Sequence, residues 1–268
     1  MTEQIIAQRL GIALRQVQGT VRLLRDGATI PFISRYRKEA TGSLDELQVG
    51  AVKEQLDKLT ELEARKQTVL STIGEQGKLT DELRKRIEAC WEAVELEDIY
   101  LPYKPKRRTR ATVARERGLE PLANSIMAQH SHDIARQAQR FVTADVPTPE
   151  EAIAGACDII AERVSEDERA RNSVRRTAAR EGAVHSRLVK GKEQEGVKYS
   201  DYFDAASPLR TVSSHRFLAM RRGMDEGVLK ISVEMDADRI TEGLCRQFVR
   251  HGSATREWME AAVADAFK

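Results

Sequence analysis

Apolar residues recur at steps of three and four over much of the chain, which is the period of helices that bury one face. The longest such stretch runs from Ser43 to Ser71, and Gly74 and Gly77 then end it. Ser43 and Glu46 have the spacing of a capping box at its start. The apolar positions that predict its buried face are Leu44, Leu47, Val52, Leu56, Leu59, Leu62, Val69 and Ile73.

The residues before this long helix divide into short helical pieces. Residues 17–25 predict a short helix that Gly27 ends, and Pro31 suits the first turn of the next helix because its missing N–H has no intrahelical partner there. Short helices joined by tight turns are typical of helix-turn-helix modules. We therefore predict a helix-turn-helix-like module that leads into the long helix, together forming a domain over residues 1–75.

Similar start signals, a capping side chain followed by acids or proline, mark the rest of the chain. They predict a helix over 80–98, one that starts at Thr148, one over 166–181 that Ser165 caps, and one after Thr255. Pro102 and Pro105 predict an extended loop over 100–112. These elements predict a helical central region over residues 76–268.

One segment, Val228–Met235, alternates apolar and polar residues with the period of a strand. Because a strand needs a partner, we expect either His215–Arg222 or a segment beyond residue 268 to pair with it. The predicted fold class is therefore mainly α, with the helix-turn-helix-like N-terminal module, long central helices and one small β element near 228–235.

The composition agrees with this fold class and narrows the setting. The chain has 16 Gly and 7 Pro among 268 residues, and only 5% of its residues are aromatic, which favours helix over a β-sandwich. Three scattered cysteines form neither a disulfide framework nor a zinc motif. No apolar run approaches the roughly 20 residues that cross a bilayer. We expect a cytoplasmic protein that has no membrane partner and needs no cofactor.

The net charge of +2 conceals two concentrated basic segments. Residues 104–117 and residues 169–190 each carry a net charge of +6, so the other residues are net acidic. Segregated positive charge is typical of surfaces that bind polyanions. If the two segments together neutralise about six phosphates of duplex DNA, the slope of log K against log salt is near −5.

The first basic segment lies in the proline-rich loop, where a tyrosine ring could stack on an exposed base. Its candidate nucleic-acid-binding residues are Tyr103, Lys104, Lys106, Arg107, Arg108 and Arg110. The alternative is that Tyr100 and Tyr103 anchor the core and that the arginines pair with local acids. Those acids are Glu95, Glu97 and Asp98.

The second basic segment offers candidates at helical spacing. Arg169, Arg176 and Arg180 are separated by seven and four residues, which places them on one face of a helix. The alternative is an ordinary solvated face. A third and smaller group of candidates lies beside Tyr36, and there the alternative is again a structural role. That group is Arg35, Arg37 and Lys38.

The sequence contains no recognisable catalytic or metal-binding motif. It lacks G-x-G-x-x-G, a phosphate-binding G-x-x-x-x-G-K-[ST] loop and H-E-x-x-H. His130 and His132 are two residues apart, so a helix would direct them to different faces. We therefore predict a protein that is not an enzyme and that holds no metal.

Three long motifs carry a resemblance to a known family. Residues 27–46 (GATIPFISRYRKEATGSLDE), 97–123 and 201–236 closely resemble, in order, motifs of the Tex family of bacterial transcription accessory proteins. The resemblance implies a cytoplasmic nucleic-acid-binding protein that starts with a helical, helix-turn-helix-containing region. It also implies a YqgF-type domain, helix-hairpin-helix modules and an OB-type barrel downstream, which this sequence lacks. We therefore expect the chain to be the N-terminal portion of a larger protein.

Two functions follow as hypotheses. The first is a non-enzymatic module that contacts the phosphates of DNA or RNA largely without sequence specificity. The second is a scaffold that docks RNA polymerase or the missing C-terminal domains of its own protein.

Overall fold

The computed structural model describes residues 1–105, 107–130 and 133–268. The chain folds into two compact units, Met1–Lys104 and Pro105–Lys268. Both consist mainly of helices, as the hydrophobic period predicts, and one small sheet lies in the second unit.

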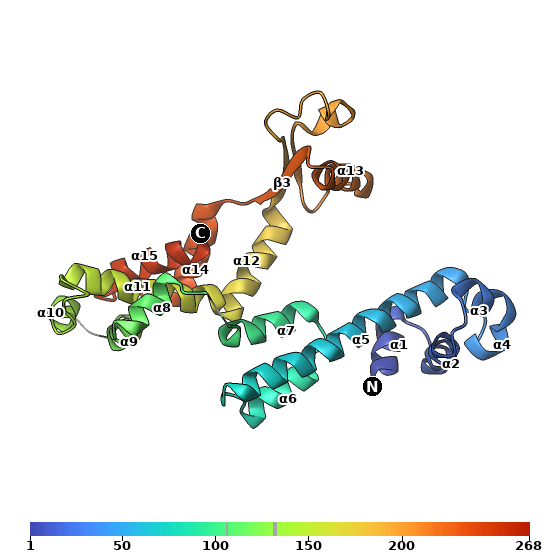
Figure 1. Cartoon of the computed structure of the whole chain (residues 1–268), viewed down its shortest axis with the longest axis horizontal. Coiled ribbons are helices and arrows are strands. Elements are labelled where there is room, and N and C mark those ends of the chain that lie inside the picture. The colour runs from blue at the N-terminus through green and yellow to red at the C-terminus, as the bar shows by residue number, and fades with distance from the viewer. Residues whose placement is uncertain (106, 131–132) are drawn as a thin grey trace. The chain divides into compact units, whose positions relative to one another are not determined.

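The first unit is organised along one long helix, α5 (Glu46–Glu75). Figure 1 shows the short N-terminal helices near one end of α5 and two later helices along its other end. The other elements are α1 (Thr2–Leu10), α2 (Leu14–Arg25), α3 (Ile30–Tyr36), α4 (Lys38–Thr41), α6 (Asp81–Ala89), α7 (Ala93–Tyr100) and the 3-10 turn η1 (Leu101–Tyr103). Buried Ile6, Val17 and Ile33 join α1, α2 and α3 to the core that α5 supplies. The helix-turn-helix-like interpretation of these short helices stays a prediction.

Helix α5 begins two residues later than the sequence pattern indicates. Gly42 and Ser43 both have left-handed backbone angles, with φ of 61° and 64°, so Ser43 does not cap the helix. Asp45 does: its carboxylate accepts the N–H of Gln48 at 2.8 Å, and the Gln48 side chain accepts the Asp45 N–H at 3.1 Å. Leu47, which we expected in the core, lies in the first turn and is 84% exposed.

The helix predicted over 80–98 is two helices. Thr80 caps α6 as predicted, but the helix ends at Ala89 and α7 starts at Ala93. Trp91 lies in the break, with its ring centroid 3.7 Å from the ammonium of the buried Lys66. This ammonium also donates to the carbonyl oxygen of Glu88 at 3.0 Å. The break therefore gives a buried charge an aromatic and a carbonyl partner, which an uninterrupted helix could not supply.

The loop predicted over 100–112 is shorter than expected. Its first residues form the turn η1, and Arg110 is already the first residue of α8 (Arg110–Glu116). The Thr109 hydroxyl caps α8 by accepting the N–H of Thr112 at 3.0 Å.

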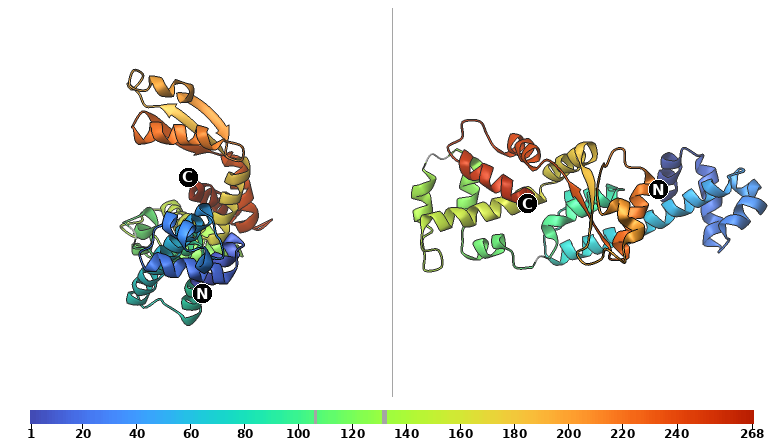
Figure 2. Two further views of the ribbon diagram at one scale, coloured as in Figure 1. Left: turned by 90° about the vertical axis from the view of Figure 1, so that its right-hand side faces the viewer. Right: turned by 90° about the horizontal axis from the view of Figure 1, so that it is seen from above.

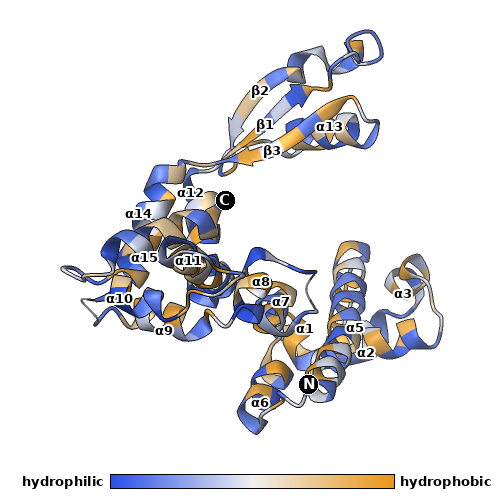
Figure 3. Cartoon of the chain, turned by 60° about the vertical axis from the view of Figure 1, so that its left-hand side comes forward, coloured by the Kyte–Doolittle hydropathy of each residue, from blue (hydrophilic) through white to orange (hydrophobic). Residues whose placement is uncertain are grey.

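In the second unit, helices pack around α11 (Pro149–Glu166), which begins at Thr148 as predicted. The helices beside α8 and α11 are α9 (Glu120–Ala128), α10 (Ile134–Gln139), α12 (Glu168–Glu181), α14 (Ala237–Phe248) and α15 (Arg256–Phe267). Leu122, Ile126, Ile159, Ile160 and Val263 are fully buried in their shared core. Figure 3 shows that both apolar and polar positions occur along these helices.

A three-stranded antiparallel sheet follows α12, with strand order β2-β1-β3. Its strands are β1 (Ala183–Leu188), β2 (Asp204–Pro208) and β3 (Leu229–Glu234), accompanied by the turn η2 (Val197–Tyr202) and helix α13 (Ser214–Asp225). Strand β3 is the predicted β element, but the partner expected within the chain, residues 215–222, is wrong, and pairing with a segment beyond residue 268 stays a prediction. Residues 215–222 are helical in α13, and β3 pairs with β1 in the register Val184–Val233. Figure 2 shows α13 lying along the sheet. The chain is therefore mainly α rather than all-α.

Candidate nucleic-acid interface

Helix α12 presents the second basic segment. Asp167 caps it, since its carboxylate accepts the N–H of Ala170 at 2.9 Å, whereas the predicted cap Ser165 donates its hydroxyl to the Glu162 carbonyl at 2.8 Å. Ala170 is the one residue of α12 that is fully enclosed by the core. Gly182 ends the helix, so Arg187 lies in β1 and does not extend the arginine face.

Arg169, Arg176 and Arg180 line one shallow surface groove of about 480 Å³. The steps of seven and four residues therefore bring these three candidates together. The other residues of the groove are all polar and offer hydrogen-bond donors. They are Asn172, Ser173 and Thr177 of α12 and Gln247 of α14. Sequence analysis missed these four. Helical spacing could have revealed the first three, but nothing in the sequence places Gln247 beside them.

The charge of this groove is largely uncompensated. Arg169 and Arg176 are exposed and form no ion pair with any residue that the structure describes. The Arg180 guanidinium donates to Glu181 at 2.8 Å, but that carboxylate also binds Arg239 at 2.8 Å. One acid is thus shared by two arginines, which leaves the groove positive. We call this set of seven residues the α12 groove.

The first basic segment has a different environment. The Arg108 guanidinium lies 2.9 Å from the Glu116 carboxylate, and the Arg115 guanidinium lies 2.6 Å from that of Glu162. Among the remaining candidates of this segment, Arg107 is exposed and has no ion pair within the described ranges, and Lys106 lies outside the described residues.

Arg110 is held by two carboxylates from other helices. It donates to Asp265 of α15 and lies 3.4 Å from Asp158 of α11. The hydrogen bond to Asp265 raises the pKa of Arg110 above its ordinary value. Burial raises the pKa of the Asp158 carboxyl, an effect that the Arg110 charge opposes. The expectation that local acids pair with these arginines is therefore wrong for Arg110, whose partners are distant in the sequence.

Tyr103 and Lys104 belong to the first unit. Tyr100 is buried there and Tyr103 packs against the same core, with its carbonyl accepting from the Gln76 side chain at 2.8 Å. Lys104 is exposed, and its charge adds to that of Arg65 in lowering the pKa of Glu97. Tyr100 therefore has the core-anchoring role of the alternative interpretation, and the binding roles of Tyr103 and Lys104 stay predictions.

The third group of candidates also belongs to the first unit. Arg35, Arg37 and Lys38 are all exposed on α3, on α4 or between them, beside the exposed Tyr36. Arg37 has only a long ion pair, 3.8 Å to Glu39. Their charges are therefore accessible to solvent.

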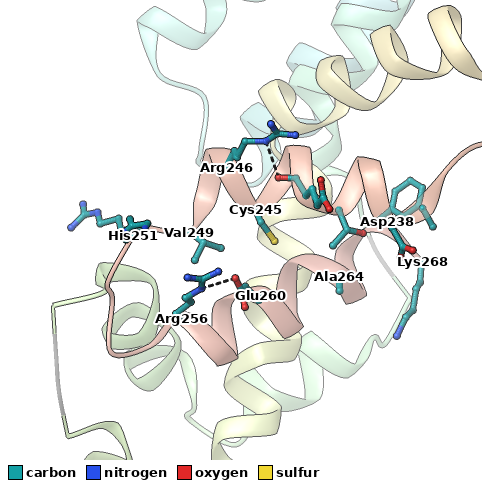
Figure 4. Close-up of a pocket in the computed structure, with 14 residues that line it drawn as sticks. Asp238, Cys245, Arg246, Val249, His251, Arg256, Glu260, Ala264 and Lys268 are labelled. Atoms are coloured by element: carbon teal, nitrogen blue, oxygen red, sulfur yellow. Dashed lines mark hydrogen bonds and ion pairs between the residues drawn. The ribbon is translucent and has the colours of Figure 1, made fainter.

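A larger groove, of about 1230 Å³, lies between α14 and α15 (Figure 4). Burial raises the pKa of the Cys245 thiol in this groove, which disfavours the nucleophilic thiolate. Arg256 donates to Glu260 at 2.8 Å, so its charge is compensated. Across residues 1–105, 107–130 and 133–268, no cluster of three His, Cys, Asp or Glu side chains could hold a metal ion. No helix of this described part is long and apolar enough to cross a membrane.

The fold and the α12 groove define the class of this protein: it is mainly helical, has two compact units, and carries a groove lined by three arginines. Two family models match the chain, one described as Tex-like protein N-terminal domain over residues 1–74 and one as Tex central region-like over residues 129–268. The chain belongs to the Tex family. The predicted domains, 1–75 and 76–268, stay predictions.

Known relatives agree with this assignment. The chain is 46% identical over 88% of its length to Transcriptional accessory protein Tex of Neisseria gonorrhoeae, and 45% identical over 99% to Protein YhgF of Escherichia coli. It is 26% identical over 92% of its length to human S1 RNA-binding domain-containing protein 1. It spans 31%, 35% and 26% of these relatives, respectively, or between a quarter and about a third of their length.

Proposed function

We propose that this chain is a cytoplasmic, non-catalytic nucleic-acid-binding module of a transcription accessory protein, and that the α12 groove is its main contact with DNA or RNA. The observation that carries the proposal is the clustering of three arginines with four neutral polar side chains in one groove that contains no acid. The names of the relatives, a transcriptional accessory protein and an RNA-binding-domain protein, support the same kind of ligand.

The spacing of the three arginines suits a phosphate backbone. A helix rises about 1.5 Å per residue, so Arg176 lies roughly 10 Å from Arg169 and roughly 6 Å from Arg180 along the axis. One strand of a duplex carries a charge about every 3.4 Å of its axis, so these intervals span about three and two phosphates. Asn172, Thr177 and their polar neighbours add donors for phosphate and sugar oxygens. Such contacts position the strand without reading its sequence.

The decisive variant replaces Arg169, Arg176 and Arg180 by Ala. Each phosphate contact contributes about 0.9 to the salt slope, so each lost contact lowers affinity roughly tenfold near 0.1 M salt. We expect the triple variant to bind a short duplex on the order of 1000-fold more weakly than the parent, measured by fluorescence anisotropy. The matched control removes the same charge from the other segment.

That control is Arg107→Ala, Arg108→Ala and Arg110→Ala in one chain. Because two of these side chains are already paired, we expect a loss of about tenfold or less. If the two triple variants lose the same affinity, total charge rather than the α12 groove governs binding. If the parent does not bind DNA or RNA at low salt, the proposed function is wrong.

The scaffold hypothesis remains a second candidate because α13 exposes apolar side chains. Phe217 and Leu218 lie on this helix and are both exposed. In this function the helix docks RNA polymerase or further domains of the same protein. The test is to replace Phe217 and Leu218 by Ser and measure binding to RNA polymerase and to the separately produced remainder of a full-length relative. Loss of either interaction with nucleic-acid affinity unchanged favours the scaffold.

A further inference from the structure

Two aromatic rings of α3 project from the first unit without joining its core. Phe32 and Tyr36 are 42% and 67% exposed, and neither belongs to the buried cluster. Ile33, between them on the same helix, is fully buried. The helix is therefore anchored by one face while the opposite face presents both rings to solvent.

The two rings form a defined pair. They are four residues apart, so they lie on the same side of the helix, with their centroids 5.6 Å apart and their planes at 44°. The high exposure of Tyr36 makes its ring available for stacking. Both rings therefore offer apolar surface to a ligand.

Positive charge surrounds this pair. The Arg37 guanidinium lies 5.6 Å from the centroid of the Phe32 ring, in cation–π range. Arg35 and Lys38 are exposed and have no ion-pair partner among the residues that the structure describes. The nearby acid is Glu39, 3.8 Å from Arg37. Three cations against one carboxylate give the surface a net positive charge, which complements a polyanion.

We propose that Phe32, Tyr36, Arg35, Arg37 and Lys38 form an aromatic platform that binds an unpaired stretch of nucleic acid. A base stacks on the ring of Tyr36, and the three cations contact the adjacent phosphates. The proposal rests on the proposed function and adds its substrate class. A duplex keeps its base faces inside the helical stack, so only a single strand can use the rings. An apolar peptide would gain nothing from the three cations.

The test compares the full 268-residue chain with its variant Phe32→Leu and Tyr36→Leu. This change keeps apolar bulk, helix propensity and charge but removes both π-faces, and it alters no member of the buried cluster. The probes are a fluorescent oligoadenylate strand and the same strand annealed to oligouridylate. The matched control is Phe217→Leu, an exposed aromatic of the second unit, and Tyr36→Phe is the conservative variant that keeps the ring.

Stacking contributes about 1–3 kcal/mol per base, so we expect the double leucine variant to bind the single strand about tenfold or more weakly. The double leucine variant keeps duplex affinity within about twofold of the parent, and its salt slope is unchanged because no charge is removed. The Tyr36→Phe and Phe217→Leu variants bind both probes as the parent does. Unchanged single-strand affinity overturns the platform while the proposed function stands. An equal loss for strand and duplex also overturns it. A parent that binds neither probe overturns both proposals.

Discussion

The two basic segments carry the same net charge in the sequence, yet in the second unit the arginines around α8 and those of the α12 groove have different environments. In the segment of α8, Arg108, Arg110 and Arg115 each have a carboxylate within ion-pair distance. On α12, Arg169 and Arg176 have none within the described residues. The difference shows that a count of charge along a segment does not measure the charge available to a ligand. What decides availability is whether other helices bring acids to the same place.

The contrast between paired and unpaired arginines can be tested by removing the carboxylates that pair with one of them. Replacing Asp158 and Asp265 by Asn removes both carboxylates that hold Arg110. One newly available cation contributes one phosphate contact, so we expect duplex affinity near 0.1 M salt to rise about tenfold. The measurement is an anisotropy titration.

The control for this gain is Glu150→Gln with Glu151→Gln, which changes the net charge equally at the start of α11, away from Arg110. We expect an increase of at most about twofold. Equal gains in the two variants would mean that pairing does not suppress the Arg110 contact.

The same comparison predicts different effects on stability. Glu162 is only 11% exposed and binds both Arg115, at 2.6 Å, and the Thr109 hydroxyl, at 3.0 Å. Removal of Arg115 takes one close opposite charge from a largely buried carboxylate, so we expect Arg115→Ala to lower the free energy of unfolding by about 1–2 kcal/mol. Arg176→Ala should change it by less than about 0.5 kcal/mol. Urea titrations followed by circular dichroism measure both, and equal losses would contradict the contrast.

The smallest expected effect concerns pH. Burial raises the pKa of Asp158 and the Arg110 charge opposes this rise, so Arg110→Ala raises that pKa further. A carboxyl whose pKa is raised in the folded state lowers the free energy of unfolding when it is ionised. It has no such effect once it is protonated in both the folded and the unfolded state. The variant should therefore be about 0.5 kcal/mol less stable than the parent at pH 7, with the difference vanishing as pH falls below about 4. Urea midpoints across this range test it, and a difference that stays constant would contradict it.

Local signals predicted much of the helical fold. The Thr80 and Thr148 caps and Pro31 mark helix starts that the structure confirms. The predicted caps Ser43 and Ser165 were wrong because an aspartate two residues later, Asp45 or Asp167, accepts the N–H bonds instead. A hydroxyl and a carboxylate compete at such positions, and backbone geometry decides between them.

The sheet could not be predicted in the same way because strand pairing is non-local. Strand β3 has a clear alternation of apolar and polar residues, whereas β1 follows an arginine-rich helix and one of its two buried positions, Ser186, is polar. Residues 215–222 looked like a nearer partner but fold as α13, which packs on the sheet that β1 completes.

In the candidate site, too, local spacing could be predicted from the sequence and non-local contacts could not. Helical period alone placed Arg169, Arg176 and Arg180 on one face, and the structure has them in one groove. The partners of Arg110 lie 48 and 155 residues away in the sequence, so no local pattern could have indicated that this candidate is paired.

The central claim is that the arginines of the α12 groove meet phosphates. The most direct test is the salt dependence of duplex DNA affinity for the parent and the two triple alanine variants. Each phosphate contact contributes about 0.9 to the slope of log K against log salt, so the α12 variant should have a slope shallower by about 2.7, and the Arg107, Arg108 and Arg110 variant by about 1. An α12 variant that keeps the parent's slope would contradict the account.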